Sequence, residues 1–401
     1  MFSFIKKLTR KQRTLLFTCF YAFFCNGTLS LMMGSAMPDI KAAYGLTDTL
    51  SGVLLSAHSI GNWAAGLLYG IIVMALGTKK SILCLDALAV LGILMVILWG
   101  NPVFLFMAFL FIGMGRGSVT NFNNTTVNRL SGGSPAASNL LHGSFAIGAI
   151  LTPMVFLAVS RLISWRAGMC FSVVVICVCL VFLVRADMTD AEPGKKAGSR
   201  SMVFLKNPSF LILSFMMFMY LCAEYSINGW LVTYIQSKQE LSSSFADEAA
   251  LKAYSQTMAT LLWAIMLIGR LTCAFLSAKI SQKKLIMISS FGVAAFFTLM
   301  LLSSSVAAVT VAVAGLGLCM AGICPMIYSC AAPFTNTYAM GTSALVCIGF
   351  LGGILMPTIV GALADRFGFG GGMAAILVSV ILLAVLAIAN VLVKTRVEAE
   401  N

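Results

Sequence analysis

Long apolar runs alternate with short polar breaks along the whole chain. Twelve runs of about 20 mostly apolar residues can be placed in the 401 residues, and a helix needs this length to cross the hydrocarbon core of a bilayer. Because the runs are continuous, they favour helices over the alternating strands of a β-barrel. The pattern therefore predicts an all-α integral membrane protein with twelve transmembrane helices. The predicted spans are about 14–37, 50–74, 80–99, 103–126, 138–160, 165–185, 208–235, 254–278, 285–304, 306–330, 341–363 and 371–393.

The basic residues orient these spans. When both ends and every second loop are placed on one side, that side collects 18 of the 26 lysines and arginines, and the other side collects six. The positive-inside rule then places both termini in the cytoplasm. The net charge of +13 is thereby explained by topology, so nucleic acid is not expected as a partner. Short loops and a compact chain favour the bacterial inner membrane as the location.

Composition removes several other classes of protein. With 60% hydrophobic and 10% charged residues, the chain is neither a soluble domain nor a disordered one. Twelve cysteines without any C-x-x-C pair, and only two histidines, argue against a zinc site or a disulfide framework. Nucleotide-binding and metalloprotease motifs are missing as well. We therefore expect no metal, no cofactor and no enzymatic activity.

One polar stretch, 187–207, divides the twelve spans into six and six. The sequence thus predicts an N-terminal six-helix bundle over 1–186, a cytoplasmic linker over 187–207 and a C-terminal six-helix bundle over 208–401.

The two halves also match each other at one fixed offset. A shift of 204 residues makes several short motifs coincide across helices two to six of each half, and this agreement is more informative than any single match. Two parallel six-helix repeats about an axis along the membrane normal are the architecture of major facilitator transporters, the fold that we expect here. The shift places Gly148-Ala-Ile-Leu-Thr-Pro153 on Gly352-Gly-Ile-Leu-Met-Pro357, Lys79-Lys80 on Lys283-Lys284, Gly113 on Gly317, and Met169 on Met373.

Four predicted helices carry more specific motifs: Gly34-Ser-Ala-Met-Pro38 in helix one, Gly113-Met-Gly115 through Asn124 in helix four, Ser138-Asn-Leu-Leu-His-Gly143 with Gly148 and Pro153 in helix five, and Glu224 with Asn228-Gly-Trp in helix seven. Together they resemble the fucose–galactose–glucose symporter group of the major facilitator superfamily. The resemblance implies uptake of a sugar or polyol driven by a cation, usually the proton. It also implies a ligand role for the helix-five asparagine, which matches at Asn139. Two carboxylate positions of the group hold Gly34 and Thr120 here.

Ionisable residues at membrane depth are costly, so each needs a partner or a water-filled cavity. Glu224 is the one carboxylate that we expect deep within a span, and it shares a helix face with Tyr220 and Asn228. A carboxylate in a low-dielectric site can exchange a proton near neutral pH, and it can also accept hydrogen bonds from sugar hydroxyls. The alternative is a structural pair with an arginine.

Amides and a second titratable group complete the candidate site. Asparagine offers donors and an acceptor, which suits a polyhydroxylated ligand, while glycines beside these amides also serve close helix packing. His142 titrates in the physiological range and is a candidate proton relay, the alternative being a hydrogen bond to a neighbouring helix. The predicted substrate-binding residues are Glu224, Asn139, Asn124, Asn121, Arg116, Asn228, Tyr220, Asn26 and Asn62, and the predicted proton-coupling residues are Glu224 and His142.

These observations predict a secondary active transporter, monomeric in the lipid bilayer, that takes up a neutral monosaccharide or related polyol with a cation, the proton being favoured. The alternative is a proton-driven exporter of small amphipathic compounds, for which 24 methionines and 28 phenylalanines would supply an adaptable cavity. A membrane-embedded enzyme would need a clustered acid–base or metal constellation, and a receptor would need a larger soluble domain. Neither is expected.

Overall fold

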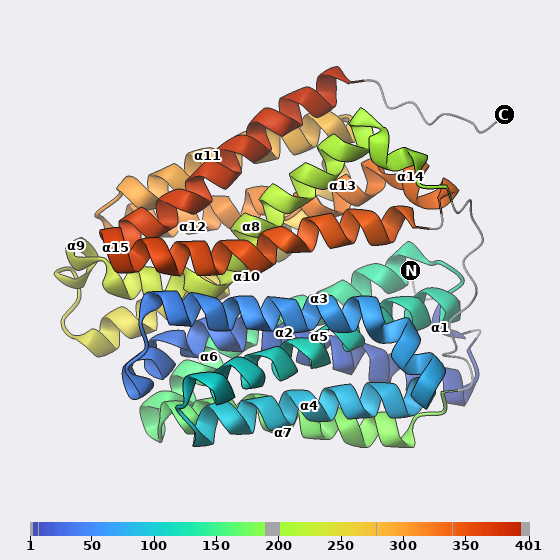
Figure 1. Ribbon diagram of the computed structural model, residues 1–401, viewed down its shortest axis with the longest axis horizontal. Helices are drawn as coiled ribbons and strands as arrows, with labels where there is room; N and C mark the ends of the chain where they lie inside the picture. Colours follow the sequence, from blue (N-terminus) through green and yellow to red (C-terminus); the bar gives the residue numbers. More distant parts are fainter. Residues whose placement is uncertain (1–2, 7, 189–200, 278, 339, 394–401) are drawn as a thin grey trace. The chain divides into compact units, whose positions relative to one another are not determined.

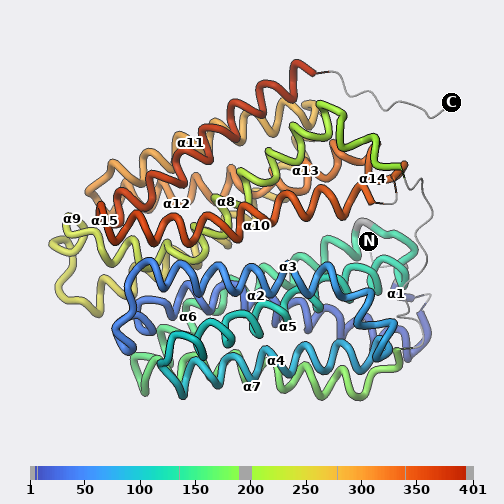
Figure 2. The backbone as a smooth tube through the Cα atoms, in the orientation of Figure 1, coloured from blue at the N-terminus to red at the C-terminus, as the bar shows by residue number. Residues whose placement is uncertain are grey.

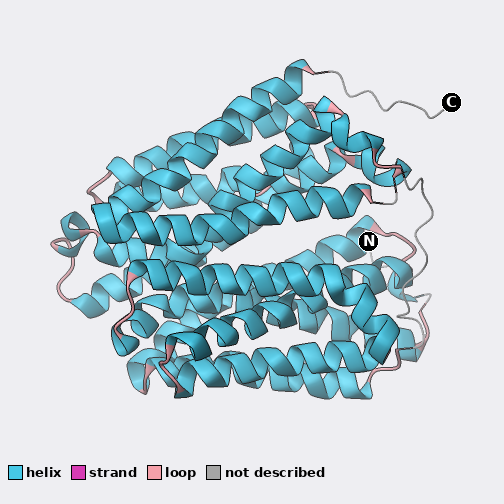
Figure 3. Cartoon of the chain, in the orientation of Figure 1, coloured by secondary structure: helices cyan, strands magenta, loops and turns pink. Residues whose placement is uncertain are grey.

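The computed structural model describes residues 3–6, 8–188, 201–277, 279–338 and 340–393. Contacts divide the chain into two compact units, Met1–Gly194 and Lys195–Asn401 (Figure 1). Every regular element in the described ranges is a helix (Figure 3). The predicted linker 187–207 spans the division between the units, and residues 189–200 of it lie outside the described ranges.

The first unit holds six long helices after one short turn. Capping explains several of their boundaries, because side chains of Thr9, Thr47, Asn101 and Ser164 accept hydrogen bonds from the first helical turns. The helices of this unit are α1 (Ser3–Lys6), α2 (Arg10–Tyr44), α3 (Asp48–Leu76), α4 (Thr78–Leu98), α5 (Pro102–Leu130), α6 (Pro135–Leu162) and α7 (Trp165–Arg185).

The second unit repeats this plan with two differences. The tenth predicted span is divided into α12 and α13, and the last two predicted spans are joined in α15. The elements of this unit are the 3-10 helix η2 (Val203–Lys206), α8 (Pro208–Ser237), α9 (Gln239–Ser242), α10 (Glu248–Leu276), α11 (Gln282–Leu302), α12 (Val306–Met320), α13 (Ile323–Cys330), α14 (Ala332–Thr337) and α15 (Gly341–Leu392).

Eleven helices in the described chain are long and apolar enough to cross a membrane, with α12 and α13 counted as one. One of them, α15, has 52 residues and covers 341–363 and all but the last residue of 371–393, so it accounts for two of the twelve predicted spans. The helix breaks at Gly368, whose φ of 72° is in the left-handed region that favours glycine. Figure 2 shows the chain reversing direction within α15. The predicted all-helical membrane fold is confirmed.

Glycines let equivalent helix pairs approach closely in both units. A Cβ on Gly113 would lie 2.0 Å from the carbonyl oxygen of His58, where α5 packs on α3. The equivalent pair, 204 residues later, is Gly317 of α12 and Leu262 of α10, where that distance is 2.5 Å. Such contacts leave no room for any larger side chain. The internal repeat seen in the sequence is thus a repeat of backbone-to-backbone helix contacts.

Lysines bind the ends of equivalent helices in both units as well. Lys79 donates to the carbonyl oxygens of Val184 at 2.6 Å and Ala186 at 3.1 Å, at the end of α7. Lys283 donates to the carbonyl oxygen of Val393 at 2.7 Å, at the end of α15. The last carbonyls of a helix lack partners within the helix, and a lysine also interacts favourably with the negative end of its dipole. The first lysine of the doubled basic motif therefore has a structural role in each bundle.

At the opposite end of each bundle a side chain caps the third helix. Tyr44 donates to the carbonyl oxygen of Val96 at 2.6 Å, at the end of α4. In the second unit Lys238 donates to the carbonyl oxygens of Met300 at 3.2 Å and Leu301 at 2.9 Å, at the end of α11. Burial lowers the pKa of the Lys238 ammonium. The backbone carbonyls correspond at the 204-residue offset, whereas the capping side chain has diverged.

Candidate functional site

A buried arginine and two polar partners form the centre of the polar cluster in the first unit. Arg116 of α5 is 7% exposed and Asn26 of α2 is 3% exposed. The Arg116 Nε donates to the Asn26 Oδ1 at 2.9 Å, and the Asn26 Nδ2 donates to the Thr120 Oγ1 at 2.7 Å. Because a buried cation needs hydrogen-bond partners, the amide oxygen of Asn26 helps to hold the arginine between α2 and α5. Two predicted site residues are thus brought together.

Helix α3 adds further buried polar groups to this cluster. His58 interacts electrostatically with Arg116, and its Nε2 atom has no hydrogen-bond partner among the described residues. Asn62 is 7% exposed, and its backbone lies against Gly113 and Gly117 of α5. His58 and Asn62 of α3 therefore lie at the contact between α3 and α5, and the predicted ligand role of Asn62 stays a prediction.

The remaining amides of α5 have different surroundings. Asn121 donates to the carbonyl oxygen of Gly66 at 2.7 Å, so its amide group joins α5 to α3. Asn124 donates to the carbonyl oxygen of Thr120 at 2.8 Å and lines a cavity of about 250 Å³ between α5 and α6. The lining consists of amides, hydroxyls and two apolar side chains, without a charged group. These residues are Asn124, Val127, Asn128, Ser134, Ser138 and Leu141.

Two predicted residues of α6 are exposed. Asn139 lies in the first turns of the helix with an exposed side chain, next to the cavity residue Ser138. His142, one turn further, is exposed too, and its ring packs edge-on against Phe23 of α2 with centroids 5.3 Å apart. Their predicted roles in substrate binding and proton coupling stay predictions.

The second unit has a polar cluster around Glu224, which is half-buried on α8. Glu224 interacts electrostatically with Tyr220 on its own helix and with Cys324 and Tyr328 on α13. Arg270 of α10 acts on Tyr220 and Cys324 too. A carboxylate, a cation and two phenols are therefore gathered from three helices of one bundle.

Hydrogen bonds to two other residues fix the helix face that carries Glu224. Tyr220 donates to the carbonyl oxygen of Met320 at 3.3 Å, where α12 ends and the tenth span is interrupted. Asn228 accepts a hydrogen bond from the Trp263 Nε1 at 3.1 Å. Interrupted membrane helices are tolerated where neighbouring groups satisfy the freed backbone, and Tyr220 provides such a group here. Tyr220 and Asn228 thus have structural bonds besides any ligand role.

A second carboxylate corrects the expectation that Glu224 alone lies deep within a span. Asp86 of α4 is 4% exposed, and the Cys179 Sγ of α7 lies 3.9 Å from its Oδ2. Eight residues separate it from the start of α4, which is about 12 Å along the helix axis. Its place inside the predicted span 80–99 is the signal that could have identified it. Asn123, which is not among the predicted site residues, has 0% exposure, and its amide makes no hydrogen bond among the described residues.

Comparisons with known proteins agree with this fold. The chain is 23% identical to the membrane protein MosC of Rhizobium meliloti, covering 87% of this chain and 84% of MosC. It is also 23% identical to an uncharacterised MFS-type transporter of Yersinia pestis, covering 86% and 87%.

Solved structures share the architecture at low sequence identity. The nucleoside transporter NupG matches with a TM-score of 0.75 and 17% identity over 96% of this chain and 99% of that one. A bacterial homolog of the human lysosomal transporter Spinster, in an inward-facing and occupied conformation, matches with a TM-score of 0.74 and 15% identity over 96% and 97%. These likenesses concern the fold.

The family model of the Major Facilitator Superfamily matches residues 19–271, which is more than half of the chain. The closer resemblance to fucose–galactose–glucose symporters stays a prediction. The chain belongs to the Major Facilitator Superfamily, and it is a multi-pass membrane transporter rather than an enzyme.

Proposed function

We propose that this transporter takes up a neutral monosaccharide or related polyol together with a cation, the proton. The observation that carries the proposal is the small cavity of the first unit, lined by Asn124, Asn128, Ser134 and Ser138 without a charged side chain. Such a lining offers both donors and acceptors to hydroxyl groups, whereas an anionic solute would find no cation in it. The buried amide and arginine network on α2 and α5 is consistent with the same substrate class.

We further propose that Glu224 binds the coupled proton. It is ionisable and half-buried at membrane depth, and it lies in one cluster with Tyr220 and Arg270. When Glu224 loses its proton, its charge changes, and so does its electrostatic interaction with every member of that cluster. Because the cluster joins three helices, this change can alter how the helices pack. His142 is the second candidate for this role.

Uptake into proteoliposomes tests the substrate class. Labelled sugars, polyols and nucleosides are offered under an imposed proton gradient, an imposed sodium gradient and no gradient. We expect accumulation of a sugar or polyol that depends on the proton gradient. Accumulation of nucleosides alone, or extrusion of hydrophobic cations, would replace the proposal by another substrate class.

The variant Glu224→Gln tests the coupling role. Glutamine keeps the size of the side chain and one accepting oxygen but cannot exchange a proton, so we expect loss of pH-driven accumulation with retained counterflow exchange. Glu240→Gln, an exposed glutamate of α9, is the matched control and should keep full accumulation. Full pH-driven accumulation by Glu224→Gln would remove Glu224 from coupling.

A further inference from the structure

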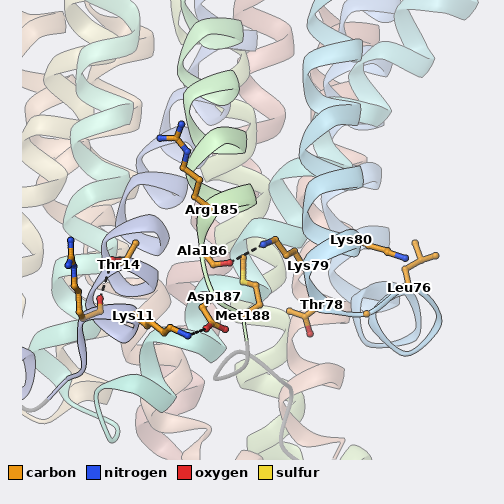
Figure 4. A pocket seen from close by; sticks show the side chains of 12 residues that line it. Lys11, Thr14, Leu76, Thr78, Lys79, Lys80, Arg185, Ala186, Asp187 and Met188 are labelled. Atoms are coloured by element: carbon orange, nitrogen blue, oxygen red, sulfur yellow. Dashed lines mark hydrogen bonds and ion pairs between the residues drawn. The ribbon is translucent and has the colours of Figure 1, made fainter.

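A basic pocket lies at one end of the first unit, away from the polar cluster. It has a volume of about 880 Å³ and is formed where α2 and α4 begin and α7 ends (Figure 4). Five cationic residues line it against one carboxylate, that of Asp187. The cations are Arg10, Lys11, Lys79, Lys80 and Arg185.

Only two of these cations are engaged by other groups of the described chain. Lys79 points at the end of α7, where it binds backbone carbonyls, and Lys11 pairs with Asp187 at 2.9 Å (Figure 4). The side chains of Arg10, Lys80 and Arg185 are exposed and make no hydrogen bond or ion pair to another described residue. The pocket therefore holds a surplus of positive charge that the described residues do not neutralise.

Exposed apolar side chains lie close along the chain to the pocket residues at the ends of α3 and α7. Leu76, which lines the pocket, is 48% exposed, and its neighbour Met74 is 80% exposed. On α7, Val184 is 55% exposed and Phe182 is 41% exposed. In a membrane-spanning bundle, exposed apolar side chains are available for contact with acyl chains. A ligand that satisfies both surfaces needs an anionic head and apolar tails.

We propose that this pocket binds the phosphate-bearing headgroup of an anionic phospholipid, with its acyl chains against the apolar ends of α3 and α7. Lysine and arginine side chains at a membrane surface each contribute to the binding of anionic lipid. Guanidinium groups also bind phosphate oxygens in bidentate geometry. A free phosphate would use the basic residues but would leave the exposed apolar side chains at the ends of α3 and α7 without a partner.

Lipid binding to the full-length protein in a non-ionic detergent tests the proposal by native mass spectrometry. The probes are phosphatidylglycerol, phosphatidylcholine with the same acyl chains, and inorganic phosphate as a competitor. We expect phosphatidylglycerol to bind, phosphatidylcholine to bind much more weakly, and phosphate to compete poorly. The double variant Lys80→Gln with Arg185→Gln should weaken phosphatidylglycerol binding by about 30-fold, from the loss of two charges near the lipid.

Two further variants keep the test specific. Lys284→Gln removes the exposed lysine that corresponds to Lys80 in the second unit, and it should leave this binding unchanged. Lys80→Arg with Arg185→Lys keeps both charges and should retain the lipid. The proposal is overturned if the charge-removing double variant binds phosphatidylglycerol as tightly as the wild type, if both lipids bind equally, or if phosphate displaces the lipid at equal concentration. An equal loss with Lys284→Gln would also overturn it, because it would mean general surface attraction.

Discussion

At the scale of single residues, the polar cluster of the first unit shows how a cation is accommodated between membrane helices. The guanidinium of Arg116 is buried with the amide oxygen of Asn26 as a hydrogen-bond partner, and the same amide donates to Thr120. One asparagine thus serves two groups of the neighbouring helix. Loss of that asparagine should affect both at once.

A double-mutant cycle tests this coupling. Asn26→Leu withdraws the acceptor from a buried charge, so it should lower the free energy of unfolding by several kcal/mol, about 3–5 as a guide. The same substitution in an Arg116→Met background should cost much less, because the charge is gone, with an interaction energy of about 0.5–3 kcal/mol. Thermal unfolding of the four proteins in one detergent measures it. Additive effects would show that the two side chains are not coupled.

A second prediction at this scale concerns Lys238, whose pKa burial lowers from its usual value of 10.5. The ammonium of Lys238 therefore loses its proton at a lower pH in the folded chain than in the unfolded chain. As the pH rises towards 10.5, the unfolded chain holds more protons at this position, so the free energy of unfolding increases. Lys238→Met removes this contribution and the cap on α11. The melting temperature of the wild type minus that of the variant should therefore increase with pH. A difference that shrinks with rising pH would contradict the direction of the shift.

Which residues matter was partly predictable from the sequence. The cost of polar groups in lipid singled out Asn26, Arg116 and Glu224. It did not reveal the bond between Asn26 and Arg116, because helix rotations decide which side chains meet. The buried carboxylate of Asp86 was not predicted, because a span was identified by its average hydrophobicity and one carboxylate barely changes that average.

At the scale of elements, the glycine contacts set how closely the helices pack. A methyl group on Gly113 would meet the backbone oxygen of His58, which cannot turn aside as a side chain can.

Gly113→Ala should therefore separate α3 from α5 and lower stability by about 1–3 kcal/mol, the usual cost of overpacking. Gly70→Ala is the matched control on α3, because nothing lies within 4 Å of the place that its new methyl group would occupy. It should be neutral or slightly stabilising, since alanine favours the helix more than glycine does. Melting temperatures in detergent compare the two. Equal decreases in melting temperature for the two variants would show that the destabilisation does not come from the close backbone contact at Gly113.

The helices themselves were predictable because length and apolar content are strong signals. Their interruptions were less so. The tenth predicted span is divided near Gly322, and Pro325, which lacks an N–H group, lies just beyond this point. The turn at Gly368 depends on the φ angle of one residue, and the hydrophobicity averaged over twenty residues carries no information about that angle.

At the scale of the molecule, the repeat explains why the fold could be predicted and the substrate could not. Packing fixes glycines and helix ends at one offset in both units, so their pattern is visible in the sequence. The polar residues differ between the units: the first carries amides around Arg116, and the second carries Glu224. Because each set is unique, no internal comparison indicates which ligand it binds.

We propose that both termini face the cytoplasm, and reporter fusions test this orientation. Alkaline phosphatase fused after Asn401 should be inactive, whereas a fusion in the loop at 243–247 should be active, since the enzyme folds only outside the cytoplasm. A fluorescent protein that folds only in the cytoplasm should give the opposite result at each place. Active phosphatase at the C-terminus would reverse the topology.

The glycine contacts also limit where the transport cycle can deform the protein. Where the backbones of two helices are in contact, side-chain rotamer changes cannot accommodate a sliding of one helix along the other. The pairs α3 with α5 and α10 with α12 should therefore move as rigid units during the transport cycle. A covalent tether placed across either pair would then leave the transport rate unchanged, while bending is left to segments such as the interruption between α12 and α13.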